Sequence, residues 1–221
     1  EREFKRAIEL NPNYALGHGL YSMYLTSMGR FDEGAIEAKR AQEIDPISPN
    51  FHIYAGWNFY HARQYDKSIE AANRVIELDP NVSMAHNILA RSYAEKKMYQ
   101  DAVSAGQRAA TLSERKGQLS KEHPLSLASL GYAYAVYGKA SEARQIIEEL
   151  KDLSSRSYIS PNHFAVIYAG LGENDKALEY LAKTFEERDE MQRFVKVSPI
   201  FDSLRSDPRF VDLMRRVGLS Q

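Results

Sequence analysis

The sequence predicts an all-α fold: a right-handed superhelical solenoid of antiparallel helix pairs with a C-terminal helical cap. The first observation is a period of 34 residues, at which Pro12, Pro46 and Pro80 recur in the similar phrases IELNPN, QEIDPI and IELDPN. The second is that the intervening residues keep the same register, as shown by Phe31, Tyr65 and Tyr99 and by His18, His52 and His86. Self-similarity at a period of this size is typical of stacked repeats.

One period contains a helix, a tight turn and a second helix, as residues 49–80 illustrate. Apolar residues recur with helical spacing up to a break at Arg63-Gln64. The second helix is predicted from Tyr65 to Leu78, with an apolar stripe that starts at Ile69. Asp79-Pro80 ends it, because the residue before a proline disfavours the α conformation. Such a pair buries its apolar stripes only by stacking on its neighbours.

This pattern divides the chain into repeats, one interruption and a tail. The segments are the second helix of a truncated repeat (1–14), five repeats (15–48, 49–82, 83–116, 124–157 and 158–189), an insertion loop (117–123) and a helical cap (190–221). The interruption reads SERKGQLSKEH from Ser113 to His123. It is interpreted as a lengthened second helix and a surface loop, or as a hinge or partner-contacting loop. No β-sheet is expected anywhere in the chain.

The tail after residue 190 is predicted to form two short helices. Ser206 or Asp207 would cap the second one, with Pro208 in its first turn. Phe210, Leu213 and Met214 give this helix an apolar face. Because a terminal repeat needs its open apolar side covered, the tail is expected to cap the solenoid.

These residues resemble the tetratricopeptide repeat family. The repeat that starts at Pro124 carries the family's residues at Leu130-Gly131, Tyr134, Gly138 and Ala143, and comparable matches cover almost the whole chain. The resemblance implies small residues where two helices cross closely. Gly29, Gly138 and Gly172 are expected to end first helices, where a positive φ favours glycine.

Composition excludes several classes of protein. The 29 basic and 30 acidic residues are well mixed and give a net charge of −1, so no direct contact with nucleic acid is expected. There is no cysteine, and hence neither a disulfide framework nor a thiolate metal site. No apolar run has the length of a membrane span, and no signal peptide is recognised. The compartment stays undetermined, with the cytoplasm favoured. Because the chain opens inside a repeat at Glu1, we expect it to be part of something longer.

The sequence offers no catalytic, metal or cofactor site. It lacks GxxxxGK[ST], GxGxxG, HExxH and GxSxG, so the chain is not expected to be an enzyme. His18, His52 and His86 would lie on the order of 10 Å apart in stacked repeats, too far to share a metal ion. They are expected to fill the bulky positions between repeats. His163 has no Ser or Cys partner that spacing would single out.

The candidate binding residues lie on the concave surface that the resemblance assigns to the first helix of each repeat. These predicted groove residues are Asn50, Ile53, Trp57, Tyr60, His61, Asn87, Arg91, Glu95, Tyr132 and Asn162. Trp, Tyr and Arg are enriched in binding hot spots. The competing interpretation is that Trp57 and Tyr132 only pack between neighbouring helices. The clamp that chaperone-binding members use for a terminal carboxylate is not reproduced, since Gly19 and Met23 occupy two of its positions.

We therefore expect a protein–protein interaction scaffold that binds a peptide segment or a helix of another protein in its concave groove. Two alternatives stay open. The stretch IYAGLGENDKALEYLAKTFEERDE with FDSLRSDPRF is similar to the C-terminal tetratricopeptide arrays of bacterial signalling proteins. That likeness implies a sensory part of a DNA-binding regulator, nucleotide cyclase or kinase. The other alternative is end-to-end self-association through an apolar face at residues 1–10.

Overall fold

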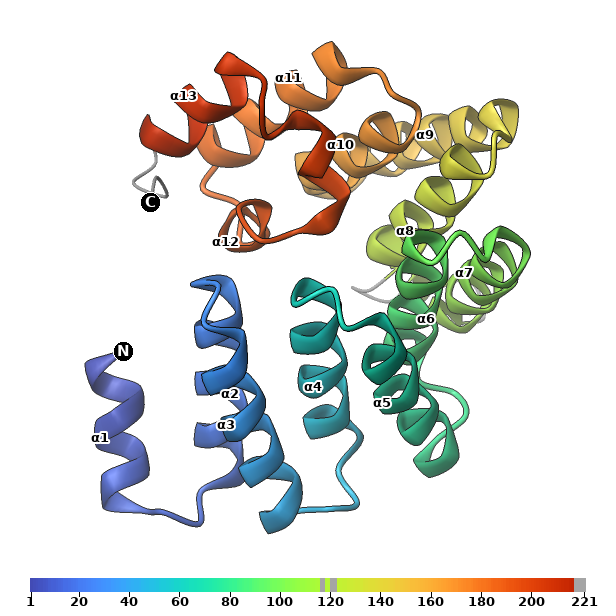
Figure 1. Ribbon diagram of the computed structural model, residues 1–221. Coiled ribbons are helices and arrows are strands. Elements are labelled where there is room, and N and C mark those ends of the chain that lie inside the picture. Colours follow the sequence, from blue (N-terminus) through green and yellow to red (C-terminus); the bar gives the residue numbers. More distant parts are fainter. Residues whose placement is uncertain (116–117, 120–122, 217–221) are drawn as a thin grey trace.

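The computed structural model describes residues 1–115, 118–119 and 123–216, and it confirms an all-α fold built from consecutive antiparallel helix pairs (Figure 1). The first helix, α1 (Arg2–Leu10), packs on the first pair. The five pairs are α2 (Ala15–Ser27) with α3 (Phe31–Ile44), α4 (Pro49–His61) with α5 (Tyr65–Leu78), α6 (Ser83–Glu95) with α7 (Tyr99–Ser113), α8 (His123–Val136) with α9 (Ala140–Ser154), and α10 (Pro161–Gly170) with α11 (Asn174–Glu186).

The turn inside each pair uses one residue in the left-handed conformation. Gly29, Gly138 and Gly172 have φ values of 78°, 82° and 72°, which confirms the sequence-based expectation for these glycines. In the other two pairs the same position holds Arg63 and Lys97, both at φ 62°. Since a side chain with a Cβ is disfavoured there, the repeat geometry imposes this conformation even where the sequence supplies no glycine.

Two of the periodic histidines tie successive repeats together. A ring nitrogen of His18 lies 3.0 Å from the carbonyl oxygen of Pro12, and the corresponding nitrogen of His52 lies 3.2 Å from that of Pro46. His18 also contacts Glu37 at 2.6 Å through its second ring nitrogen. The histidine thus links the end of one repeat to the start of the next, a more specific role than filling space.

Close helix crossings occur where the sequence has small residues. A Cβ added to Gly131 on α8 would lie 2.6 Å from the Cδ1 atom of Ile167 on α10. Ala143 on α9 is completely buried in the same core. This core runs from α6 into the tail, where it includes Phe210, Leu213 and Met214. The tail helix α13 (Pro208–Arg216) therefore shares one continuous core with the last repeats.

The interruption after α7 differs from its prediction. The helix ends at Ser113, and Glu114–Arg115 (β1) pairs antiparallel with Gln118–Leu119 (β2). The expectations of a lengthened helix and of no β-sheet are thus wrong for this segment, because the backbone groups beyond Ser113 are paired in a short ladder instead of a further helical turn. Residues 116–117 and 120–122 of the predicted loop, and residues 217–221 of the predicted cap, lie outside the described part of the chain.

The chain curves so far that its C-terminal part meets its N-terminal repeats. The short helix α12 (Gln192–Val195) contacts α2, and the 3₁₀ helix η1 (Pro199–Leu204) packs on α10. Figure 1 shows α12 above the ends of α2 and α4, on the inner side of the curve. The concave face is therefore closed by residues 188–205, which we call the closing segment.

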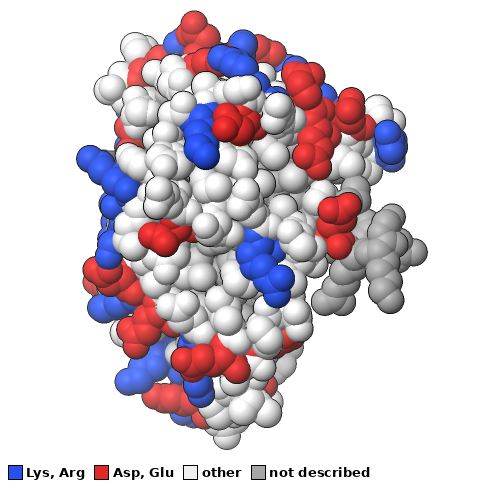
Figure 2. Space-filling model, turned by 90° about the vertical axis from the view of Figure 1, so that its right-hand side faces the viewer, with Lys and Arg blue, Asp and Glu red and all other residues white. Residues whose placement is uncertain are grey.

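Among the described helices, none has the length and apolarity that crossing a membrane requires. Figure 2 shows the side of the molecule that lies at the right of Figure 1. Basic and acidic side chains are interspersed there around a mostly uncharged centre.

Candidate functional site

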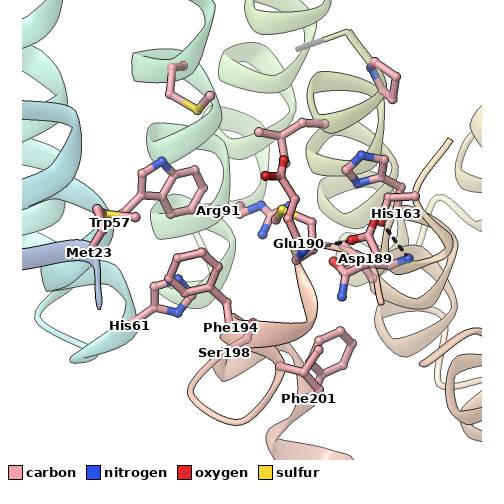
Figure 3. A pocket seen from close by; sticks show the side chains of 18 of the residues that line it. Met23, Trp57, His61, Arg91, His163, Asp189, Glu190, Phe194, Ser198 and Phe201 are labelled. Carbon is pink, nitrogen blue, oxygen red and sulfur yellow. Dashed lines mark hydrogen bonds between the residues drawn. The ribbon is translucent and has the colours of Figure 1, made fainter. Parts of the chain in front are cut away.

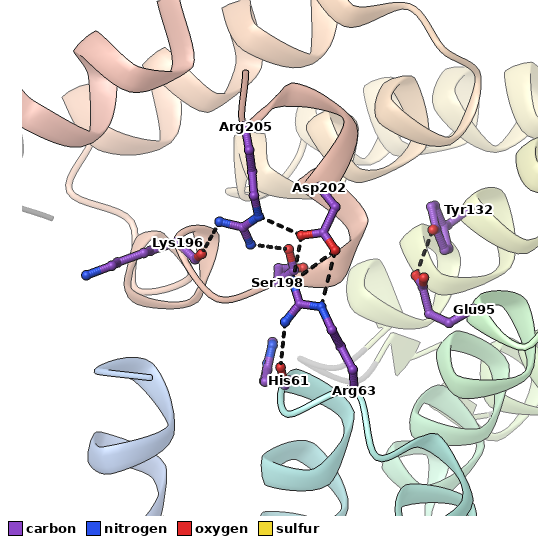
Figure 4. Close-up of polar contacts among 8 residues, drawn as sticks. All are labelled: His61, Arg63, Glu95, Tyr132, Lys196, Ser198, Asp202 and Arg205. Carbon is purple, nitrogen blue, oxygen red and sulfur yellow. Dashed lines mark hydrogen bonds and ion pairs between the residues drawn. The ribbon is translucent and has the colours of Figure 1, made fainter. Parts of the chain in front are cut away.

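The closing segment is held against α4 by one ring contact and one ion pair. The Phe194 ring stacks on the His61 ring, with centroids 5.2 Å apart and planes within 5°. Arg63, which follows α4, donates to both carboxylate oxygens of Asp202 at 2.7 and 2.9 Å (Figure 4). Arg205 contacts the same carboxylate at 2.6 Å and donates to the Lys196 carbonyl at 2.7 Å. The closing segment is therefore braced internally before it meets the repeats.

Beneath this segment lies a cavity of about 420 Å³ on the concave side (Figure 3). It is bounded by α2, α4, α6, α8, α10 and the closing segment. Its lining residues are Met23, Trp57, His61, Met84, Arg91, Pro124, Leu125, Tyr158, Ser160, Asn162, His163, Val166, Asp189, Glu190, Met191, Phe194, Val195, Ser198 and Phe201. Eleven of these nineteen residues are apolar or aromatic and eight are polar or charged, a mixture that suits a ligand with both kinds of surface.

Arg91 is the one buried cation of this lining within the described residues, and only 4% of it is exposed. Its Nε donates to the Ser129 hydroxyl at 3.1 Å, and its guanidinium lies 5.4 Å from the centre of the Trp57 ring. Its Nη2 has no hydrogen-bond partner, and the guanidinium makes no ion pair with any described carboxylate. Burial lowers the pKa of Arg91, while the nearby Tyr60, Tyr132 and Glu95 oppose that shift.

Two buried histidines flank the cavity as neutral rings. His61 is 5% exposed and His163 is 8% exposed, and the Nδ1 atom of each lacks a hydrogen-bond partner. Burial lowers the pKa of His61 to about 3, and Arg91 and Arg63 add to the shift. Burial and Arg91 likewise lower the pKa of His163 to about 4, against the opposing effect of Asp189. In the described part of the chain no cluster of three or more His, Asp or Glu side chains is placed to hold a metal ion.

Acidic groups near the cavity are already paired or face solvent. Asp189 is 7% exposed and accepts hydrogen bonds from the Tyr158 hydroxyl at 2.9 Å and from the Met191 amide at 2.8 Å. Glu190 is exposed at the cavity's edge. Glu95 accepts a hydrogen bond of 2.8 Å from the Tyr132 hydroxyl (Figure 4), and burial raises its pKa. The positive charge of Arg91 therefore faces the cavity without a dedicated counter-charge.

The structure separates the predicted groove residues into two groups. Trp57, His61, Arg91 and Asn162 line the cavity. The other six lie elsewhere: Ile53, Tyr60, Asn87 and Tyr132 are buried, Glu95 is half-buried and Asn50 is exposed. Asn87 donates to the Ser126 hydroxyl at 3.1 Å, so its amide joins α6 to α8. A partner-binding role for all ten stays a prediction.

The site also contains residues that the sequence reasoning did not select. Phe194 and Phe201 enter the lining from the tail, which was expected only to cap the last repeat, and Asp189 enters from the end of the repeat 158–189. His163 lines the cavity beside Asn162, although it was considered only as a catalytic residue. Phe194, Val195 and Val197 are apolar in the sequence, but this does not distinguish a cap on α11 from a segment that also reaches α4.

Comparison with known proteins supports the repeat assignment. Residues 55–116 match the model of a family described as tetratricopeptide repeat, which is a repeat family and not an enzyme family. Among curated proteins, no sequence matches the chain significantly.

Solved structures share the fold over most of the chain. A thermophilic tetratricopeptide repeat protein of Thermus thermophilus superposes with a TM-score of 0.62 at 16% identity, covering 85% of this chain and 98% of its own. PilF of Pseudomonas aeruginosa gives 0.58 at 17% identity, with 93% and 89% covered. The Cut9–Hcn1 hetero-tetramer of the APC/C gives 0.65 at 14% identity, with 97% of this chain and 41% of that chain covered. The chain thus has the fold of tetratricopeptide repeat solenoids.

Proposed function

We propose that this solenoid of tetratricopeptide repeats is a protein–protein interaction scaffold that binds a peptide segment of another protein on its concave face. The observation that carries the proposal is the contact between Trp57 and Arg91, which come from successive first helices and lie 5.4 Å apart at the cavity. Aromatic and arginine side chains in a desolvated pocket are the usual anchors of protein interfaces. One structure with the same fold, Cut9–Hcn1, is itself a complex of two proteins.

The closing segment limits how a partner reaches this site. Phe194 covers His61, so a long peptide would have to displace the closing segment from α4 or enter at its edge. The displaced contacts would be modest, because the ion pair between Arg63 and Asp202 is about two-fifths exposed, and exposed ion pairs contribute at most about 1 kcal/mol. We therefore expect partner binding to be accompanied by movement of the closing segment away from α4, which opens the closed ring that the repeats and the closing segment form together.

The test is selection of binding peptides from a random library displayed on phage, followed by affinity measurements on wild type and variants. Trp57→Ala is expected to weaken a selected peptide by about thirtyfold, equivalent to the roughly 2 kcal/mol of a hot-spot residue. Arg74→Ala is the matched control, since Arg74 lies exposed on α5, outside the cavity, and pairs with Glu77. Peptides that bind the Trp57→Ala variant as tightly as wild type would place the interaction surface elsewhere.

Self-assembly is a second candidate function, favoured by one observation. Leu16, Leu20 and Ile36 on the first complete pair are 41%, 42% and 67% exposed, and Leu10 at the end of α1 is 70% exposed. Apolar side chains gathered at one end of a solenoid suit stacking on another repeat. Light scattering against concentration tests this function. If the protein self-assembles, the measured mass should rise with concentration for wild type and should stay at the monomer value for Leu20→Glu.

A sensory role in a larger signalling protein is the third candidate, supported by the cavity beneath the closing segment. A ligand held under the closing segment would favour the conformation in which this segment contacts α4. That shift in conformation could alter the activity of an attached effector domain. The test is whether a cavity ligand alters the activity or DNA binding of the full-length protein that contains these repeats. An effector that responds equally with the ligand absent and present would exclude the role.

A further inference from the structure

The cavity supports a second binding function, which uses Trp57 and Arg91 as the proposed protein interaction does but with a different ligand. We propose that it is a site for a small monocarboxylic acid, whose carboxylate pairs with Arg91 and whose apolar body packs against Trp57 and Phe194. Four observations lead to this assignment: an unpaired buried cation, a mainly apolar lining, two neutral histidines and partial cover by the closing segment.

The unpaired cation is the strongest of these observations. Removing a guanidinium from water costs several kcal/mol unless a counter-charge and hydrogen bonds replace the water. Arg91 donates to the Ser129 hydroxyl, and its guanidinium lies over the Trp57 ring. Its Nη2 is buried without an acceptor. A planar carboxylate is the group that matches the fork of a guanidinium, so a bound acid would supply both the missing acceptor and the missing charge.

The lining specifies the rest of the ligand. Trp57, Leu125, Val166 and Phe194 contribute apolar side chains to the cavity that Arg91 lines. Figure 3 shows Trp57 and Phe194 on the same side of the cavity as Arg91. The volume of about 420 Å³ lies within the range of small-molecule pockets. An acid with a phenyl ring or a medium alkyl chain suits this combination of one cation and a mainly apolar wall.

The neighbouring polar groups favour a single negative charge. His61 and His163 are neutral and add no second cation. Each offers an Nδ1 atom without a partner, which suits a hydroxyl or amide on the ligand. Asp189 and Glu190 also line the cavity and would repel a second carboxylate. A dicarboxylate should therefore bind more weakly than the matching monocarboxylate.

The closing segment makes the site selective for small ligands. Phe194 and Met191 cover the cavity from the tail side, and Phe194 rests on His61. A free acid fits under this roof, whereas a peptide that ends in the same group needs the segment displaced. The two sources of a carboxylate can therefore be distinguished by experiment.

The experiment is titration calorimetry of the full chain with phenylacetate and octanoate, each compared with its primary amide. We expect at least one acid to bind and its amide to bind at least tenfold more weakly, since a hydrogen bond to a charged group carries about that preference. Arg91→Met is expected to remove the preference, whereas Arg74→Met, on the outer surface, should retain it. Equal binding of acid and amide, no binding of either acid, or a preference retained in Arg91→Met would overturn the proposal.

A second measurement on wild type locates the ligand without any substitution. The ring protons of His61 and His163 should shift in NMR spectra when the acid is added, and those of His52, which lies outside the cavity, should not. The remaining ligand to be tested is a peptide that is blocked at its N-terminus and ends in phenylalanine with a free carboxylate. If that peptide binds and the free acids do not, the site recognises protein termini and the small-acid assignment is wrong. Peptide selection on Trp57→Ala fails or succeeds independently of these outcomes.

Discussion

Acidification should destabilise this protein through its two buried neutral histidines. The perturbation is a change from pH 7 to pH 5. The pKa of His61 is lowered from 6.5 to about 3 in the folded chain, and that of His163 to about 4. A group whose folded pKa is depressed loses stabilisation as the pH falls below its unfolded pKa, because the unfolded state binds the proton first. For both histidines this loss starts near pH 6.5 and continues down to pH 3–4.

The magnitude follows from the pKa values. At pH 5 an unfolded histidine is almost fully protonated, while both folded rings stay neutral. Each histidine then lowers the free energy of unfolding by about 2 kcal/mol relative to pH 7, so the pair removes about 4 kcal/mol. That is a large share of the 5–15 kcal/mol typical of a folded domain. His86 adds to the loss, since burial and Arg108 lower its pKa. Glu95 opposes this loss, because burial raises its pKa and the folded state therefore binds a proton at a higher pH than the unfolded state does.

The assay is urea unfolding at pH 7 and pH 5, followed by circular dichroism and by the fluorescence of Trp57. The matched variant is His61→Gln with His163→Gln, in which neither position titrates. Its unfolding free energy should change by about 4 kcal/mol less than that of wild type between the two pH values. An equal pH dependence in the two proteins would refute the assignment of these rings as buried and neutral.

Three further predictions concern the repeat geometry and the closed ring. Lys97→Gly should raise the free energy of unfolding by about 0.5–1 kcal/mol, because Lys97 is exposed and has φ 62°. Gly138→Ala, at φ 82°, should lower the free energy of unfolding by about 1 kcal/mol. Chemical denaturation measures the sign of both changes. Gly131→Leu should cost about 1–3 kcal/mol by overpacking, since a Cβ there already lies 2.6 Å from Ile167, and thermal unfolding measures the loss. Asp202→Asn should weaken closure while changing global stability by at most about 1 kcal/mol. Hydrogen exchange should then quicken in α12 and not in α6, and unchanged exchange in α12 would contradict the role of the ion pair.

The helix pairs could be predicted from sequence because their contacts are between neighbours. Each pair packs on the next at an interval fixed by the repeat, so one period determines the local geometry. The contact between Trp57 and Arg91 is an example, since these residues are 34 positions apart and occupy the same place in successive repeats. The same register explains why Arg63 and Lys97 take the turn conformation of Gly29.

Ring closure could not be predicted in this way, because it joins positions that the period does not relate. Arg63 and Asp202 are 139 residues apart in the sequence, and their distance in space depends on the small rotation that each repeat adds. A polar pair at such a separation carries no signal in a single sequence. The groove residues were therefore placed on an open surface, and the tail that covers His61 was assigned only to the last repeat.

His61 connects the two unusual features of this structure, which are the contact of the closing segment with the N-terminal repeats and the cavity. One face of its ring stacks on Phe194 of the closing segment, and the same residue lines the cavity beside Trp57. A ligand under the closing segment contacts groups from both sides and so binds the closed ring more tightly than an open one. By linkage, the ligand must then favour closure by the same factor by which closure favours the ligand. A partner peptide that displaces Phe194 binds the open ring, and the acid and the peptide should therefore weaken each other's binding without sharing every contact.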